Sequence, residues 1–251
     1  RLRRRLMWPL SPFDTAWCAI AVALGYGVRG MAGFGSGVVA TPLLAFVLPM
    51  TTTAPLVTIL GFVVSLQHAL RYRRDICWKA LVPFVPSSLV GVPIGLWVVK
   101  TANSDLLARL LGAYILAYAL YSLFGERVFG RALGMPHWVA HPLGFVGALI
   151  STLLGGLAGP IYVTYFDTLG LAKGVFRVTV STTLLALSIV RTTGYFATGV
   201  FRSEDLILVV AALAPAAIGT LAGEWVHDRI EQTTFRRYIA WLLVLSGLGL
   251  L

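Results

Sequence analysis

Long apolar runs, separated by short segments rich in charge, proline or glycine, recur along the whole chain. Most of them are long enough to cross roughly 30 Å of hydrocarbon as a helix. The pattern predicts an all-α membrane protein with a single transmembrane domain of about eight helices. The expected spans cover residues 15–28, 53–70, 79–99, 104–124, 138–154, 174–199, 204–224 and 233–251.

Two further stretches, residues 30–49 and 155–170, combine a glycine-rich break with an apolar piece too short to be an ordinary span. Non-helical backbone at membrane depth is tolerated only where protein or a wet cavity satisfies its polar groups. We therefore expect broken or re-entrant segments that line a cavity. Thr41 and Pro42 have the residue types of an N-cap and a first helical residue, so a short helix is predicted to begin there.

Gly159 and Pro160 predict the start of a matching short helix in the second stretch. The positive ends of two such helices could face one site and attract an anion. The alternative is that these glycines only let helices approach one another closely. The candidate substrate contacts are Gly33, Gly35, Ser36, Gly37, Thr41 and Pro42 in the first stretch, and Gly155, Gly156, Gly159 and Pro160 in the second.

The two groups of helices resemble each other. A pair of glycines at Gly91 and Gly95, which we assign to helix packing, recurs 128 residues later (219 − 91) as a second pair. This spacing predicts two repeats of four helices, over about residues 15–124 and 138–251. Chance similarity among apolar, glycine-rich helices is the alternative.

Composition supports the membrane assignment, with 58% apolar residues, 12% charged residues and a mean hydropathy of +0.84. The net charge of +10 would suggest nucleic acid in a soluble protein, but here Lys and Arg lie mainly between apolar runs and are topology signals. We expect the lipid bilayer and a small anionic substrate as partners, and no nucleic acid. Oligomeric state is left open.

The arginine clusters near residues 1–5, 71–74 and 127–131, with Arg202, can all face the cytoplasm only if residues 30–49 and their counterpart are re-entrant. The N-terminus would then be cytoplasmic and the repeats parallel. If those segments cross fully, the cluster at 71–74 lies on the opposite side.

No catalytic machinery is evident, because the chain has no paired carboxylates in a span, no nucleophile elbow and no nucleotide loop. Cys18 and Cys77 make neither a metal spacing nor a disulfide framework. We therefore expect no enzyme activity, no metal and no cofactor. The basic start could be a secretory signal, but prolines and an acid within residues 9–14 interrupt it, and we expect the native chain to begin before Arg1.

Ionisable residues inside spans are costly and tend to be functional. Arg191 is the first candidate, since it lies in mid-span and a guanidinium there could hold an oxyanion bidentately. Arg177 lies nearer a span end, where it is either a substrate contact or an interfacial anchor. His68 roughly matches Arg191 in the other repeat and could bind substrate or carry a proton, or be structural.

The run Gly33-Phe34-Gly35-Ser36-Gly37-Val38-Val39-Ala40-Thr41-Pro42-Leu43-Leu44, with Tyr72-Arg73-Arg74-Asp75 and a second copy after Gly155, resembles the TauE/SafE family, also called the sulfite exporter or TSUP family. The resemblance implies a bacterial or archaeal inner-membrane carrier of two repeats that moves sulfite, sulfonates, sulfoacetate or other small organic anions. The second copy departs from the pattern, because residues 155–160 hold fewer glycines than expected, which puts a strictly two-fold site in doubt.

These observations together indicate a secondary transporter, an exporter of a small anion, in which one repeat rocks against the other to give alternating access. An anion channel would need the same basic pore features without alternating access. A membrane scaffold or receptor that moves no solute is the third alternative.

Overall fold

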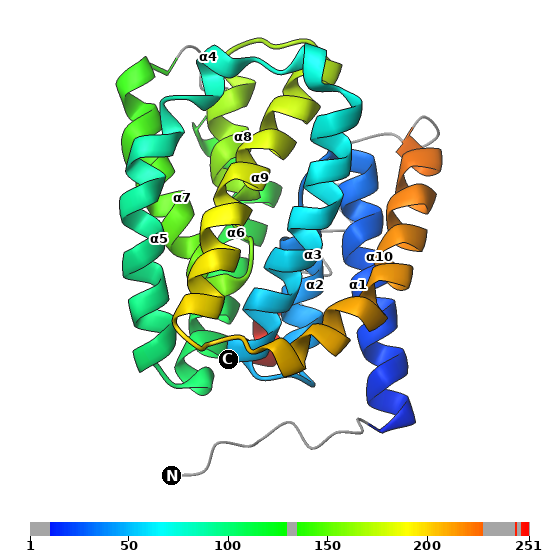
Figure 1. Cartoon of the computed structure of the whole chain (residues 1–251). Coiled ribbons are helices and arrows are strands. Elements are labelled where there is room, and N and C mark those ends of the chain that lie inside the picture. The colour runs from blue at the N-terminus through cyan, green and yellow to red at the C-terminus, as the bar shows by residue number, and fades with distance from the viewer. Residues whose placement is uncertain (1–10, 130–134, 228–243, 245–246, 251) are drawn as a thin grey trace.

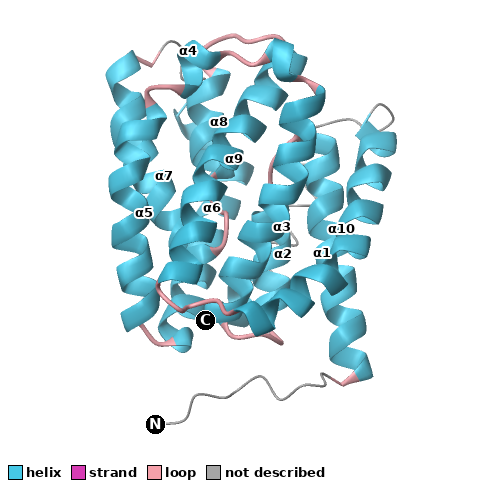
Figure 2. Cartoon of the chain, viewed as in Figure 1, coloured by secondary structure: helices cyan, strands magenta, loops and turns pink. Residues whose placement is uncertain are grey.

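The computed structural model describes residues 11–129, 135–227, 244 and 247–250. Every regular element in this part of the chain is helical, as Figure 2 shows, which confirms the all-α prediction. The last expected span, residues 233–251, falls almost wholly outside the described residues. Four described helices are long and apolar enough to cross a membrane, namely Met50–Arg71, Phe84–Thr101, Gly174–Ala197 and Ser203–Trp225.

Helices α1 (Pro12–Ala32) and α2 (Ser36–Ala45) form a hairpin around the first glycine-rich break. Ser11 caps the first turn of α1, and the helix ends where Gly33 adopts φ 81°. Gly35, with φ 95°, directly precedes α2. Left-handed backbone strains other residues by about 1–2 kcal/mol but costs glycine little, so glycine is required in this turn.

The expected helix start at Thr41 and Pro42 is wrong, because α2 already begins at Ser36. Pro42 lies inside α2, and the Thr41 hydroxyl donates a hydrogen bond to the carbonyl of Gly155 at 3.1 Å instead of capping its own helix. The left-handed glycines, not the proline, therefore determine where the short helix begins.

Helices α7 (Ala140–Leu154) and α8 (Gly159–Asp167) form the second hairpin. Gly155 ends α7 with φ 73° and Gly156 follows with φ 89°. Pro160 lies in the first turn of α8, where its missing N–H is not needed. The predicted start of a short helix at Gly159 and Pro160 is confirmed.

The long helices α3 (Met50–Arg71) and α9 (Lys173–Ala197) follow the two hairpins and pack against each other. The remaining long helices are α5 (Phe84–Thr101), α6 (Ser104–Phe129) and α10 (Leu206–His227). The short helical segments are η1 (Arg73–Asp75), α4 (Trp78–Leu81), η2 (His137–Val139) and η3 (Ser203–Asp205).

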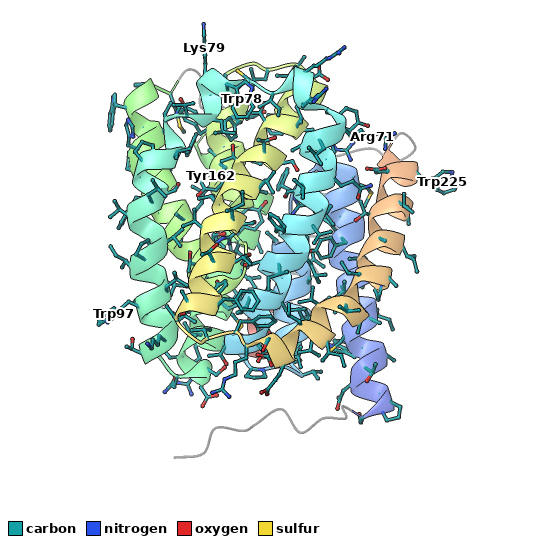
Figure 3. The ribbon with its side chains drawn as sticks, viewed as in Figure 1. Arg71, Trp78, Lys79, Trp97, Tyr162 and Trp225 are labelled. Carbon is teal, nitrogen blue, oxygen red and sulfur yellow. The ribbon has the colours of Figure 1, made fainter. Side chains whose placement is uncertain are left out.

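The two hairpins open toward opposite ends of the bundle. In Figure 1, α1 begins at the lower end, whereas α7 begins at the upper end, and α3 and α9 run in opposite directions. The expectation of parallel repeats is therefore wrong. A re-entrant segment would have left the chain at the end of the bundle where α1 stops, whereas α2 returns toward the end where α1 begins. Arg71 consequently lies at the upper end in Figure 3, opposite the start of α1, and not at the end that the re-entrant arrangement requires.

Close helix contacts join the two parts of the chain. A side chain at Gly223 would meet the backbone of Gly27, so α1 and α10 approach backbone to backbone at the right of Figure 1. At the left, a Cβ at Gly91 would lie 3.1 Å from that of Ala148, which joins α5 to α7. The assignment of Gly91 and its partner glycines to helix packing is thus confirmed.

The outer surface suits a lipid environment. Ile218 and Leu221 on α10 are 66% and 64% exposed, and they lie on a helix with the hydropathy of a span. Trp78 and Trp225 lie toward the upper end and Trp97 toward the lower end in Figure 3, as expected of aromatic residues at the two membrane interfaces.

Candidate functional site

The two glycine-rich breaks meet at the centre of the bundle. A Cβ on Gly37, in the first turn of α2, would lie 2.6 Å from the carbonyl oxygen of Gly155 and 2.9 Å from that of Gly156. The hydrogen bond from Thr41 to Gly155 fixes the same contact one turn further along α2. Only glycine at position 37 lets the start of one hairpin helix lie directly on the turn of the other.

A cavity of about 20 Å³ lies beside this contact. Its polar lining comes from both hairpins and both central helices, and consists of Arg29, Ser36, Thr58, Gly156, Ser188 and Arg191, with Gly37 beside Ser36. Such a volume holds about one water molecule. In this conformation, the cavity therefore has no room for an anion much larger than water.

Arg191, the first candidate from the sequence, lines this cavity and is only 2% exposed. Its Nη1 donates to the carbonyl of Ser151 at 2.9 Å and also to the Ser151 hydroxyl. Nη2 donates to the hydroxyl of Ser188 at 3.2 Å, and Nε to the carbonyl of Leu187 at 3.4 Å. Arg191 thereby joins α9 to the last turn of α7.

Arg29 lines the same cavity from α1 and is 6% exposed. Its Nη1 donates to the hydroxyl of Ser36 at 3.3 Å, and its Nη2 donates to the hydroxyl of Ser65 on α3. The sequence-based prediction missed this residue because the expected span stopped at residue 28. The signal was present, since Arg29 directly precedes the glycine-rich stretch at residues 30–49, which was expected to line a cavity.

Neither guanidinium has an acidic partner in the part of the chain that the structure describes. Among the described residues, the one ion pair joins Arg177 to Glu224, with 3.7 Å between Nη2 and Oε1. Buried charges are normally paired, because removing an ion from water is costly. Two buried cations that share a cavity, held only by hydroxyls and carbonyls, create a site that favours an anion.

The N-terminus of α2 adds to this electrostatic preference. Gly35 provides no side-chain cap, and Ser36 and Gly37, whose N–H groups have no acceptor inside the helix, line the cavity. The start of α8 does not reach the cavity, because Gly159 packs instead on the ring of Phe34. One of the two predicted helix ends therefore faces the site.

Arg177 and His68 lie outside the cavity lining. Arg177 donates from Nη2 to the carbonyl of Gly30 at 2.6 Å, which with its ion pair to Glu224 ties the start of α9 to α1 and α10. His68 is half-buried and packs on the ring of Tyr72, with 4.9 Å between ring centroids. The geometry of Arg177 is that of an anchor between helices.

A bundle of apolar helices, two broken-helix hairpins of opposite direction and a polar cavity where they meet define a polytopic membrane transporter. The chain belongs to the sulfite exporter TauE/SafE family, whose model matches residues 17–250. The expected family is confirmed, and with it a membrane transporter rather than an enzyme.

One curated relative is named "Probable inner membrane transporter protein TsaS" and comes from Comamonas testosteroni. It is 28% identical over 197 residues, which cover 78% of this chain and 81% of the relative. No solved structure matches the chain. The relative and the apolar helices together identify a multi-pass protein of the inner membrane.

Proposed function

We propose that this protein is a secondary transporter that exports a small oxyanion such as sulfite, a sulfonate or sulfoacetate. The observation that carries the proposal is the pair of buried guanidiniums, Arg29 and Arg191, that line one cavity without a carboxylate partner among the described residues. An oxyanion would supply the missing negative charge and accept hydrogen bonds from a guanidinium. Membership of the sulfite exporter family supports sulfur oxyanions as the substrate class.

The small volume of the cavity favours a carrier over a channel. About 20 Å³ admits roughly one water molecule, so a larger anion enters only if the surrounding helices move apart. Two hairpins of opposite direction are the arrangement that alternating-access transporters use to expose one site to either side. We propose that residues 15–124 and 138–251 form two inverted repeats on this plan.

The expected rocking of one repeat against the other needs revision on this plan. The close contacts of α1 with α10, and of α5 with α7, each join one helix of the first repeat to one helix of the second. The moving units in our proposal are therefore these two pairs, on either side of α3 and α9. The basic segment at residues 1–5 supports a cytoplasmic N-terminus.

The sequence-predicted residues divide by role in this proposal. Ser36, Gly37, Gly156 and Arg191 line the substrate cavity. The others shape or hold the surrounding backbone: Gly33, Gly35 and Gly155 form the left-handed turns, Thr41 and Pro42 belong to α2, and Gly159 and Pro160 begin α8.

Counterflow in proteoliposomes tests the transport proposal. Vesicles preloaded with sulfite should accumulate external labelled sulfite transiently. An alternating carrier exchanges internal for external sulfite faster than net efflux dissipates the sulfite gradient. Replacement of both cavity arginines, Arg29→Gln with Arg191→Gln, should abolish the exchange, whereas Arg202→Gln, which changes an exposed arginine, should leave it intact. Flux without saturation or counterflow would indicate a channel, and no flux of any sulfur oxyanion would refute the proposal.

A further inference from the structure

We infer that Arg29, together with the hydroxyl of Thr58, is the principal anion ligand of the cavity, and that Arg191 is a positioning residue. This inference rests on the proposed transport of an anion, and it reverses the ranking that the sequence suggests. It concerns which groups touch the substrate and which hold the backbone around it.

The hydrogen bonds of the two arginines differ. A guanidinium offers five N–H donors on three nitrogens. All three nitrogens of Arg191 donate to protein groups, through four hydrogen bonds. Arg29 makes two, both to serine hydroxyls, and its Nε donates to no group in the described chain. Arg29 thus has more donors left for a ligand.

Thr58 is the second, independent sign of a ligand. This residue of α3 lines the cavity and is 2% exposed, and its Oγ1 has no hydrogen-bond partner of normal geometry in the described structure, although the Tyr195 hydroxyl lies near it. Other buried threonines, such as Thr182 and Thr183, donate to the carbonyl four residues earlier. A buried polar group without a partner is rare and calls for an explanation. A hydroxyl that donates to a bound anion provides one.

These groups form a consistent cradle. Arg29 and Ser36 are hydrogen-bonded to each other, so the guanidinium lies next to the free N–H groups at the start of α2. Thr58 lines the same cavity from α3. An oxyanion there would accept from a guanidinium, a hydroxyl and helix N-terminal amides, a donor set suited to several oxygens on one sulfur atom.

Arg191 acts instead on the backbone of the second break. The carbonyl of Ser151, which accepts from Arg191, also accepts the N–H of Gly155 at the end of α7. Removal of the guanidinium would leave this carbonyl and the Ser188 hydroxyl with fewer partners at the point where the chain turns. We expect the turn, and with it Gly156 beside the cavity, to lose its position.

Titration calorimetry and thermal shift on the purified full chain separate these roles. The probes are sulfite, sulfoacetate and sulfate, with lactate for comparison. Loss of a hydrogen bond to a charged group corresponds to about a 10- to 100-fold change in affinity. Arg29→Gln should weaken binding about 100-fold, Thr58→Val about tenfold, and Arg29→Lys should recover part of the loss.

The variants also differ in stability without ligand. Thr58→Val should melt no lower than the wild type, because it removes an unpartnered hydroxyl at nearly constant volume. Arg191→Gln should melt lower, yet below its melting temperature it should bind within about tenfold of the wild type. Arg202→Gln is the control for a generic loss of charge.

The outcomes distinguish this inference from the proposed function. If the wild type binds an anion, and Arg29→Gln and Thr58→Val bind it equally well, Arg29 is not the ligand although the protein remains an anion transporter. If the wild type binds none of the probes, the proposed function and this inference both fail. If Arg29→Gln does not fold, the affinity of Thr58→Val decides, and unchanged affinity overturns the inference.

Discussion

Arg29 and Ser151 occupy matching positions in the two hairpins. The carbonyl of each accepts the N–H of a left-handed glycine four residues later, which ends its helix. Each side chain also bonds to the following long helix, Arg29 to Ser65 on α3 and Ser151 to Arg191 on α9. In the first half, the hairpin provides the arginine and the long helix provides the serine. In the second half, the hairpin provides the serine and the long helix provides the arginine.

This exchange places one arginine from each half at the cavity although the two sequences do not match residue by residue. His68 lies 18 residues after the start of α3 (68 − 50), and Arg191 lies 18 residues after the start of α9 (191 − 173). By this count His68 corresponds to Arg191, but the hydrogen bonds make Ser65 the counterpart of Arg191, and His68 lies outside the cavity lining. Arg29, in a different helix, supplies the second positive charge.

Arg177→Met should lower stability without abolishing transport. The substitution removes the hydrogen bond to Gly30 and the partly exposed ion pair with Glu224, for a loss of about 1–2 kcal/mol. Melting temperature and counterflow measured on the same preparation check this expectation. A variant that is as stable as the wild type but transports nothing would indicate that Arg177 contacts the substrate.

Gly37→Ala should destabilise the protein by about 1–3 kcal/mol, because its methyl group would lie 2.6 Å from the carbonyl oxygen of Gly155. Gly174→Ala is the matched control, since this helical glycine of α9 has no atom within 4 Å of an added Cβ. That change should be neutral or slightly stabilising. Thermal unfolding of both variants measures the difference, and equal stability would contradict the close contact between the two breaks.

Gly156→Ala should impair transport more than Gly170→Ala does. Both glycines have positive φ, 89° and 62°, and neither has an atom within 4 Å of an added Cβ. The backbone strain, about 1–2 kcal/mol, should therefore be similar. Only Gly156 lines the cavity, so only its variant should lose substrate binding at equal stability. Counterflow by the two variants, compared once their melting temperatures are shown to be equal, distinguishes backbone strain from a loss of substrate binding.

Cysteines placed at Arg73 and Arg202 should be labelled from opposite faces of the membrane. Both positions are exposed, and η1 and η3 lie at opposite ends of the bundle in Figure 1. A membrane-impermeant thiol reagent on oriented vesicles, after replacement of Cys18 and Cys77 by alanine, gives the measurement. Labelling of both positions from one face would restore the parallel arrangement that the arginine clusters suggested.

Glycine and charge patterns predicted the breaks and Arg191 because each depends on local chemistry: left-handed turns need glycine, and a mid-span arginine must be buried. Arg29 and the start of α2 depend on more distant contacts. α1 continues to Ala32 although a charge interrupts its apolar run, because the hydroxyls of Ser36 and Ser65 accept hydrogen bonds from that guanidinium inside the protein. The direction of α2, and hence the inverted arrangement, depends on the turn through Gly33 and Gly35.

The pairing of α1 with α10, and of α5 with α7, also bears on biogenesis. During insertion, α1 acquires its backbone-to-backbone partner only when α10 has entered the bilayer, after α2 to α9 have been synthesised. Until then its glycine face must be covered by lipid or by other helices of the translocation machinery. Residues 1–129 expressed alone would leave α1 without this partner, so the membrane assembly of the first half depends on the second.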